Sequence, residues 1–287
     1  MKQIHPVPQR VIDQIVANAL AEDCPRGDIT AGTILPAEAR ATAAVVARQP
    51  GVLAGAQVFA RVMHQVDERI EVNHLLVDGQ PFRVGDRLIE VTGPAASILT
   101  AERVGLNLLQ RMSAIATATA VLVERVAHTK ARIADTRKTT PGLRALERYA
   151  VRCGGGVNHR DNLSDAFMAK DNHLALLGGG QALTAALQQV RSQLGHTTAM
   201  EVEVDEISQI PAVLAAGVDV IMLDNFAPQD IPAAIKLIDG QAMVEASGNV
   251  SARTVAEIAE TGVDIISSGA ITHSVAAIDL GLDVVIE

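Results

Sequence analysis

Short aliphatic runs that alternate with helical segments constrain the fold of this chain more than any other feature. The runs lie at residues 132–136, 166–170, 199–204, 219–224, 242–247 and 264–269, and each ends in polar or charged residues. One run repeats: GVDVIML at 217–223 returns as GVDIISS at 262–268, each time opening on a glycine suited to the end of a helix. Strands alternating with helices predict right-handed βαβ units and a parallel sheet. Six units over about 140 residues predict a (β/α) barrel or a close relative.

The chain before residue 132 shows different patterns. Residues 8–21 carry apolar side chains at helical spacing, and residues 41–100 are rich in strand patterns separated by turn signals, which together indicate an α+β module. Residues 100–127 show the pattern of one long helix, with Thr100 as the expected N-cap. GLDVVIE at 281–287 repeats the strand pattern with no helix after it, and we expect it to return to the first domain as a strand.

The composition narrows the function classes. Hydrophobic residues make up 48% of the chain but aromatic residues only 2%, so the core must be aliphatic, as in parallel strands covered by helices. The scarcity of aromatic side chains and the net charge of −9 argue against a nucleic-acid partner. The two cysteines lack paired spacing, and we find neither a secretory signal nor a run of about 18 apolar residues. We therefore expect a cytoplasmic protein that does not bind membranes.

A basic segment stands out in this acidic chain. Residues 130–170 hold nine Lys and Arg against four acidic residues, a local net charge of +5. The segment also contains the glycine run 154–156, whose backbone can pass close to a ligand or adopt positive φ. Like charges that face one cleft focus their potential onto it. The segment predicts a site for a small substrate with several negative charges.

Polar residues at the ends of the predicted strands should meet at one edge, where parallel barrels hold their catalytic groups. Four cations there could bind carboxylates or phosphates: Arg137, Lys138, Arg160 and Lys170. Surface ion pairing is the alternative for each. His159 could donate to a carboxylate or serve as a structural hydrogen-bonding residue. Lys170 could also form a Schiff base, and this option stays open.

The remaining strand ends offer acids and small residues. Glu203 and Asp224 could hold Mg²⁺ together with phosphate oxygens, pair with Lys170 or Lys138, or act as a general base. Two short stretches could bind phosphate or simply form turns: Ser247, Gly248 and Asn249, and Ser268, Gly269 and Ala270. We interpret Cys153 as a small buried residue, and Arg103 and Arg111 on their own as solvated or ion-paired positions on a helix face.

The segment DTRKTTPGLRALERYAVRCGGGVNHRDNLSDAFMAKDNH at 135–173 resembles the central signature of the quinolinate phosphoribosyltransferases, a type II phosphoribosyltransferase family. EDCPRGDIT, EVEVD, MLDNF, EASGN and SSGAITHS resemble further motifs of that family, so the likeness covers nearly the whole chain. It implies an α/β fold with an N-terminal α/β sandwich domain at 1–112, joined by a C-terminal strand at 272–287. An incomplete α/β barrel of seven strands would follow at 113–271.

The resemblance also implies an activity and its residues. Phosphoribosyl would pass from phosphoribosyl pyrophosphate to quinolinate with loss of CO₂, giving nicotinate mononucleotide and pyrophosphate for NAD biosynthesis. Arg137, Lys138, His159, Arg160 and Lys170 would line the dicarboxylate pocket, and Arg103 would enter from the partner subunit of a homodimer. Lys138, Glu203 and Asp224 would be catalytic, the two acids holding Mg²⁺, while Ser247–Asn249 and Ser268–Ala270 would hold phosphate.

Two alternatives remain beside this function. One is a relative of the same fold, of the molybdenum-transport type, that acts on another acid. The other is a non-catalytic protein that binds phosphate or a nucleotide.

Overall fold

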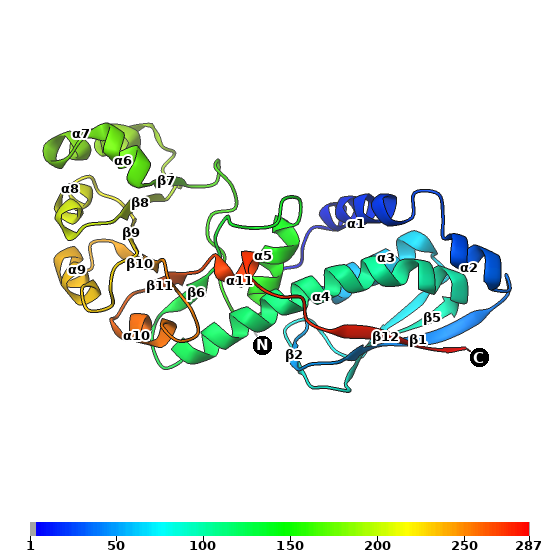
Figure 1. Ribbon diagram of the computed structural model, residues 1–287. Helices are drawn as coiled ribbons and strands as arrows, with labels where there is room; N and C mark the ends of the chain where they lie inside the picture. The colour runs from blue at the N-terminus through cyan, green and yellow to red at the C-terminus, as the bar shows by residue number, and fades with distance from the viewer. Residues whose placement is uncertain (1–3, 287) are drawn as a thin grey trace. The chain divides into compact units, whose positions relative to one another are not determined.

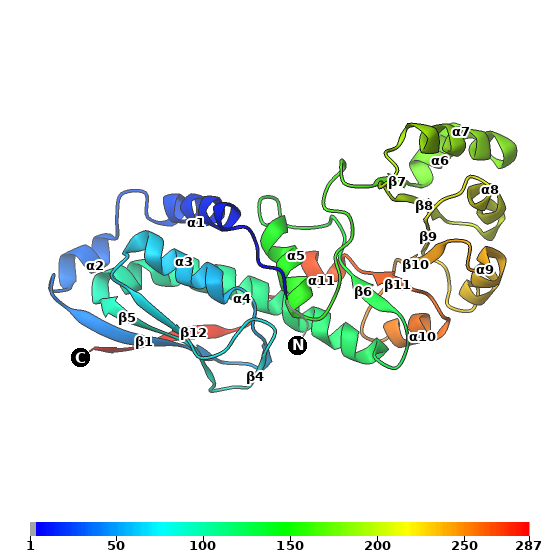
Figure 2. The same ribbon diagram turned by 180° about the vertical axis from the view of Figure 1, so that it is seen from behind.

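The computed structural model describes residues 4–286, which divide into two compact units (Figures 1 and 2). The first unit takes in residues up to Ala120, Thr139–Gly155 and the segment from Ile271 onward. The second unit takes in Val121–Lys138 and Gly156–Ala270. The domain boundaries expected from the sequence, after residues 112 and 271, stay a prediction.

An antiparallel sheet of four strands forms the first unit, in the order β12-β1-β5-β3. Its strands are β1 (Arg40–Ala47), β3 (Glu71–His74), β5 (Arg87–Pro94) and β12 (Leu280–Ile286). The C-terminal strand β12 runs along β1, with Ala43 opposite Val284, so segments far apart in the sequence lie side by side (Figure 1). A separate short pair, β2 (Gly51–Val52) with β4 (Pro81–Phe82), completes the strands of this unit.

Helices complete the first unit: α1 (Gln9–Asp23), α2 (Ile29–Ile34), α3 (Ala56–Val66) and α5 (Arg144–Cys153). The prediction of α1 is confirmed, whereas α3 lies in a segment that the sequence indicated as strand-rich. Val58, Phe59, Val62 and Met63 of α3 are all buried. Their spacing along the chain is the local signal for this helix.

The long helix is α4 (Ala95–Val126). The expected N-cap at Thr100 is wrong, because the helix begins at Ala95 and the Thr100 hydroxyl donates to the carbonyl of Ala96 at 2.9 Å inside it. By length and composition α4 could cross a membrane, although the sequence pattern had suggested no such segment. More than half of its apolar window, 56%, is buried inside the protein, as in the core helix of a soluble protein.

The second unit is built on a parallel sheet in the order β6-β11-β10-β9-β8-β7. Its strands match the six predicted runs: β6 (Arg132–Ala134), β7 (Phe167–Ala169), β8 (Met200–Val204), β9 (Val220–Asp224), β10 (Met243–Ser247) and β11 (Ile265–Ser267). Val157 adds a single parallel bridge to Ala134, outside β6. The predicted α/β fold with an incomplete barrel is confirmed, but the described parallel sheet has six strands where the resemblance implied seven.

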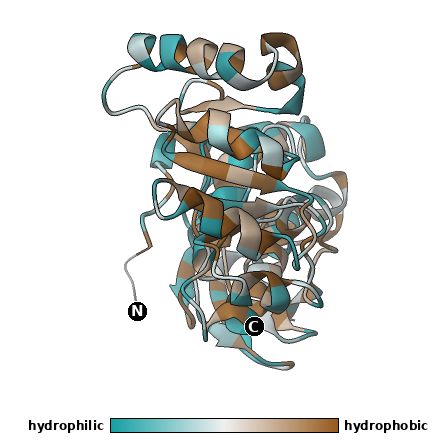
Figure 3. Ribbon diagram, turned by 90° about the vertical axis from the view of Figure 1, so that its left-hand side faces the viewer, coloured by the Kyte–Doolittle hydropathy of each residue, from teal (hydrophilic) through white to brown (hydrophobic). Residues whose placement is uncertain are grey.

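Helices follow the strands of the second unit: α6 (Asp171–Leu177), α7 (Gly180–Gln193), α8 (Ile210–Leu214) after the short turn η1 (Ile207–Gln209), α9 (Ile231–Ile238) and α10 (Val255–Glu260). They line one side of the strands in Figure 1, and in Figure 3 their ribbons alternate between hydrophobic and hydrophilic segments. A last helix, α11 (Ala270–His273), follows β11. Apolar residues such as Val202, Leu223 and Ile266 are fully buried in the strands between.

The repeated motif has a structural role. Gly217 and Gly262 follow α8 and α10 with φ of 71° and 96°, a conformation that glycine adopts without strain. Asp219 then accepts a hydrogen bond from the backbone of Met200 at 2.7 Å, and Asp264 accepts one from Val244 at 2.9 Å. Each aspartate therefore fastens its own strand to the start of a neighbouring strand.

Candidate functional site

The carboxyl ends of the second unit's strands meet at one edge of the sheet. Ser247 at the end of β10 pairs in register with Asp224 of β9 and Ser267 of β11, and Ser267 pairs with Ala134 of β6. Arg137 and Lys138 follow β6 by a few residues, and Lys170 follows β7 directly. The predicted strand-end residues therefore share this edge because parallel strands bring their ends together.

Lys170 and Glu203 form an ion pair within the site. The Lys170 Nζ atom lies 2.5 Å from a carboxylate oxygen of Glu203, whose side chain is only 8% exposed. Ion pairing was one of the alternatives for Glu203, and the structure shows it. The Lys170 side chain is 44% exposed, so its remaining N–H donors can reach a substrate carboxylate.

Arg137 and Arg160 are electrostatic neighbours. Burial lowers the pKa of Arg160, and the positive charge of Arg137 lowers it further, while the carboxylates of Glu201 and Asp165 act in the opposite direction. The Arg160 guanidinium also donates to the carbonyl of Ala166 at 3.1 Å. The positive charge of Arg137 acts on Arg160 at a partly buried position, and this arrangement favours an anionic ligand.

The loops after β9 and β10 interlock around Gly248. Gly248 has φ of 91°, and a Cβ atom there would lie 2.1 Å from Oδ1 of Asn225. Asn225 donates to Asp224 at 2.8 Å and accepts from the side chain of Asn249 at 3.3 Å. The proposed phosphate loop at 247–249 is thus tied to the predicted magnesium ligand Asp224.

The second small-residue stretch, Ser268–Ala270, is hydrogen-bonded to the sheet at its first residue. Ser268 is buried, and its backbone N–H donates to the carbonyl of Ala134 at 3.0 Å. That donor is engaged with the sheet in this conformation. Helix α11 begins two residues later, at Ala270.

The glycine run serves packing at its first position. A Cβ atom on Gly154 would lie 2.3 Å from the carbonyl oxygen of Ala116, so α5 ends directly against the backbone of α4. Gly155 has φ of 88°, so it adopts the positive φ that was one of the two roles expected of the run. Cys153 beside it is buried, and burial together with the Asp78 charge raises its pKa to about 12, which confirms a buried residue and disfavours a nucleophile.

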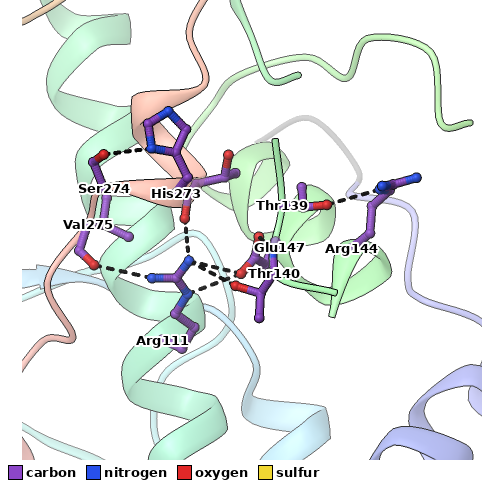
Figure 4. A network of polar contacts seen from close by, with 9 residues as sticks. Arg111, Thr139, Thr140, Arg144, Glu147, His273, Ser274 and Val275 are labelled. Atoms are coloured by element: carbon purple, nitrogen blue, oxygen red, sulfur yellow. Dashed lines mark hydrogen bonds and ion pairs between the residues drawn. The ribbon is translucent and has the colours of Figure 1, made fainter. Parts of the chain in front are cut away.

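Arg103 and Arg111 of α4 have different surroundings. Arg103 has a side chain that is 60% exposed and lies 3.9 Å from Glu102. Arg111 pairs with buried Glu147 at 3.0 Å and donates to backbone carbonyls of Thr272 and Val275 (Figure 4). The ion-paired interpretation is confirmed for Arg111, whereas Arg103 is the arginine whose side chain is available to another molecule.

Sequence reasoning missed a cluster of buried acids beneath His159. The imidazole Nε2 atom lies 2.9 Å from Glu201 and 3.7 Å from Glu245, and Asp135 accepts from the His159 backbone at 2.7 Å. Burial lowers the pKa of His159, but the surrounding carboxylates raise it by more, so the net direction is upward. Alternating glutamates in the aliphatic run EVEV were the available signal, since they place Glu201 on the same face as Glu203.

Comparison with known proteins extends the match beyond this site. The family model for the quinolinate phosphoribosyl transferase C-terminal domain matches residues 115–283, and the model for the N-terminal domain matches residues 28–113. The chain belongs to the quinolinate phosphoribosyl transferase family. The sequence resemblance is thereby confirmed over both domains of the family.

The relatives are similar to this chain over almost their whole length. This chain is 43% identical over 274 residues to the nicotinate-nucleotide pyrophosphorylase [carboxylating] of Mycobacterium leprae, covering 93% of this chain and 95% of that protein. It is 40% identical over 273 residues to the probable enzyme of the same name in Bacillus subtilis, covering 95% and 93%.

Solved structures of the same family share the fold. The nicotinate-nucleotide pyrophosphorylase of Francisella tularensis matches with a TM-score of 0.91 at 38% identity, covering 99% of this chain and all of the other. The protein of the same name from Ehrlichia chaffeensis matches with a TM-score of 0.89 at 39% identity, covering 95% and 98%.

Proposed function

We propose that this chain transfers phosphoribosyl from phosphoribosyl pyrophosphate to the ring nitrogen of quinolinate, with loss of the C2 carboxylate as CO₂. The products are nicotinate mononucleotide, pyrophosphate and CO₂, a step of NAD biosynthesis. The match to both domain models of the family carries this proposal, and the cations Arg137 and Arg160 agree with it. They suit a substrate with two carboxylates.

The proposed roles follow from charge. Arg137, Arg160 and Lys170 neutralise the two carboxylates, which would otherwise repel the diphosphate. Lys138 stabilises the charge that develops on the leaving pyrophosphate while C1 of the ribose becomes oxocarbenium-like. Bonding at the ring nitrogen makes it cationic, so it stabilises the electron pair that loss of CO₂ leaves at C2, and C2 then takes up a proton.

The remaining predicted residues hold the donor. Ser247, Gly248 and Asn249, with Ser268, Gly269 and Ala270, contact its phosphates, and Arg103 enters from the partner subunit of a homodimer. His159 lies beside Arg160 at the dicarboxylate pocket, and the protein acts in the cytoplasm. These assignments rest on the family motifs at these positions.

Glu203 and Asp224 suit a magnesium ion shared with the diphosphate. Both are hard oxygen donors on neighbouring strands, and Mg²⁺ is usually held by one or two carboxylates together with substrate phosphates. Lys170 pairs with one carboxylate oxygen of Glu203 at 2.5 Å, so Glu203 would offer Mg²⁺ its other oxygen. Bound Mg²⁺ would neutralise charge on the pyrophosphate.

The test is turnover. Purified protein is incubated with quinolinate, phosphoribosyl pyrophosphate and Mg²⁺, and release of CO₂ is followed beside an active relative. Absence of turnover would remove the proposed reaction. Arg160→Ala should raise the KM for quinolinate far more than that for phosphoribosyl pyrophosphate, and an equal change in both would contradict the role of Arg160.

The same assay separates the alternatives. A relative acting on another acid would show turnover with a different acceptor, and a sensor would bind nicotinate mononucleotide tightly without turnover. Schiff-base chemistry needs a neutral amine, whereas the Lys170 ammonium pairs with Glu203. Borohydride trapping with a carbonyl substrate should therefore give no adduct at Lys170.

A further inference from the structure

Buried carboxylates surround the turn that carries His159 and Arg160, and the proposed reaction gives them no role. Asp135 is fully buried, while Glu201 and Glu245 are 6% and 4% exposed. Burying ionised groups costs free energy unless their partners are well placed. Their contacts therefore show what they hold in position.

Asp135 fixes the backbone of the turn. One carboxylate oxygen accepts from the backbone N–H of His159 at 2.7 Å, and the other accepts from the side-chain amide of Asn158 at 2.6 Å. The backbone of Val157 continues the pairing, donating to Ile133 at 2.8 Å and accepting from Asp135 at 3.2 Å. Asp135 thus locks the turn to the end of β6, two residues before Arg137.

The imidazole of His159 has opposite roles at its two nitrogens. Nδ1 accepts a hydrogen bond from the backbone N–H of Arg160 at 2.7 Å, so it carries a lone pair. Nε2 must then hold the ring proton, which points to Glu201 at 2.9 Å. The nearby carboxylates favour a second ring proton, but on Nδ1 it would face the Arg160 N–H directly. The geometry therefore favours the neutral Nε2–H form.

The same geometry argues against a metal ion. His159, Glu201 and Glu245 place possible ligand atoms within 4.8 Å of one another, as a metal site would. A metal ligand needs a lone pair on Nε2, and shifting the proton to Nδ1 would set two N–H groups face to face. One oxygen each of Glu201 and Glu245 is buried without a hydrogen-bond partner. The metal alternative therefore needs an experimental test.

We propose that Asp135 and Glu201 are positioning residues. They hold the backbone and the ring of His159 so that its Nδ1 atom fixes the backbone of Arg160, from which the guanidinium reaches a substrate carboxylate. This inference rests on the proposed function in one respect, the role of Arg160 in binding the dicarboxylate. The contacts hold Arg160 beside Arg137 although the two cations repel each other. Glu201 supplies part of the attraction that offsets this repulsion.

Kinetics test the positioning role. Asp135→Ala and Glu201→Leu should raise the KM for quinolinate about tenfold to a hundredfold, with kcat and the KM for phosphoribosyl pyrophosphate much less affected. Glu201→Gln keeps an oxygen that can accept from Nε2–H and should restore quinolinate binding. Asp219→Ala, which removes another carboxylate that accepts from a strand backbone, is the matched control and should lower only thermal stability.

Two kinetic outcomes would overturn the proposal. One is an unchanged KM for quinolinate in Asp135→Ala and Glu201→Leu. The other is the same pattern in these variants as in Asp219→Ala, which would show a merely structural role.

A spectroscopic test does not depend on turnover. In protein labelled with ¹⁵N-histidine, His159 is assigned among the eight histidines by the signals lost in His159→Asn. At pH 7 its Nε2 should be protonated and its Nδ1 unprotonated, and addition of Mn²⁺ or Zn²⁺ should not change this. Protonation of both nitrogens, or metal-induced loss of the Nε2 proton, would overturn the inference. If His159 has the expected tautomer but the protein shows no turnover, only the proposed reaction is contradicted.

Discussion

The fold moves the ionisation of Glu245 into the physiological pH range. Burial first, and then the neighbouring charge of Glu201, raise its pKa from 4.5 to about 7. Near pH 6 the folded protein therefore holds a proton on Glu245 that the unfolded chain has lost. The stabilisation this gives is complete below about pH 4.5 and is lost as the pH rises to about 7.

Glu245→Gln should remove this pH dependence. Between about pH 4.5 and 7, the free energy of unfolding of the wild type should fall relative to the variant, by an amount on the order of 3 kcal/mol. Urea unfolding across this range measures the difference. Glu257→Gln makes the same change at an exposed position and should leave the profile parallel to the wild type. A parallel profile for Glu245→Gln as well would contradict the raised pKa.

Gly248 gives a second prediction at the residue scale. Gly248→Ala should strain the backbone and push Asn225 away from Asp224, since the new Cβ atom would meet the Asn225 side chain. We expect a loss of roughly 1–3 kcal/mol of stability and a higher KM for phosphoribosyl pyrophosphate. Gly240→Ala, where φ is 70° but no atom lies close, is the control for backbone strain alone. Equal effects on the KM in both variants would remove the proposed role of the 247–249 loop.

At the scale of elements, Arg111 fastens three segments of the first unit. It joins α4 to Glu147 of α5 and to the backbone of residues 272 and 275, while Glu147 also accepts from the backbone of Thr140 at 3.1 Å (Figure 4). Glu147 is fully buried, so removing its cation leaves an uncompensated charge.

Arg111→Met should therefore destabilise the protein by about 3–5 kcal/mol, and Glu147→Gln in the same background should recover part of the loss. Thermal unfolding of the single and double variants measures both effects. Arg125→Met, a change at an exposed position near the end of the same helix, is the control. A single variant as stable as the wild type would show that the pair contributes nothing.

The sequence predicted the strands of the second unit well and its contacts poorly. The aliphatic runs ending at Asp224 and Ser247 have the length and flanking glycines of buried strands, so their positions follow from local pattern. The hydrogen bonds of Asp135 and the His159–Glu201 contact join residues far apart in the chain, and no local pattern encodes them. The expected N-cap at Thr100 was wrong for a different reason. Packing extends α4 to Ala95, beyond the residue with the best local capping chemistry.

At the scale of the whole molecule, the proposed homodimer predicts complementation. Coexpression of Arg103→Ala and Lys138→Ala chains should recover about one quarter of the wild-type activity, because half of the dimers are mixed and each then has one intact site. Lys138→Ala with Lys170→Ala should recover none, since both residues belong to one subunit's part of the site. Activity of the unfractionated coexpressed protein measures this, and no recovery in the first pair would rule out a site shared through Arg103.

The pairing of β12 with β1 bears on how the protein is made. β1 ends at Ala47 and its partner strand begins at Leu280, so the whole second unit is synthesised between the two halves of that pairing. Domains generally fold in the order in which they leave the ribosome. The first unit departs from this order, because β1 leaves the ribosome early and its β12 edge stays uncovered until the chain has passed residue 280. Translation must therefore finish the second unit before the first can close, and an exposed strand edge persists during most of synthesis.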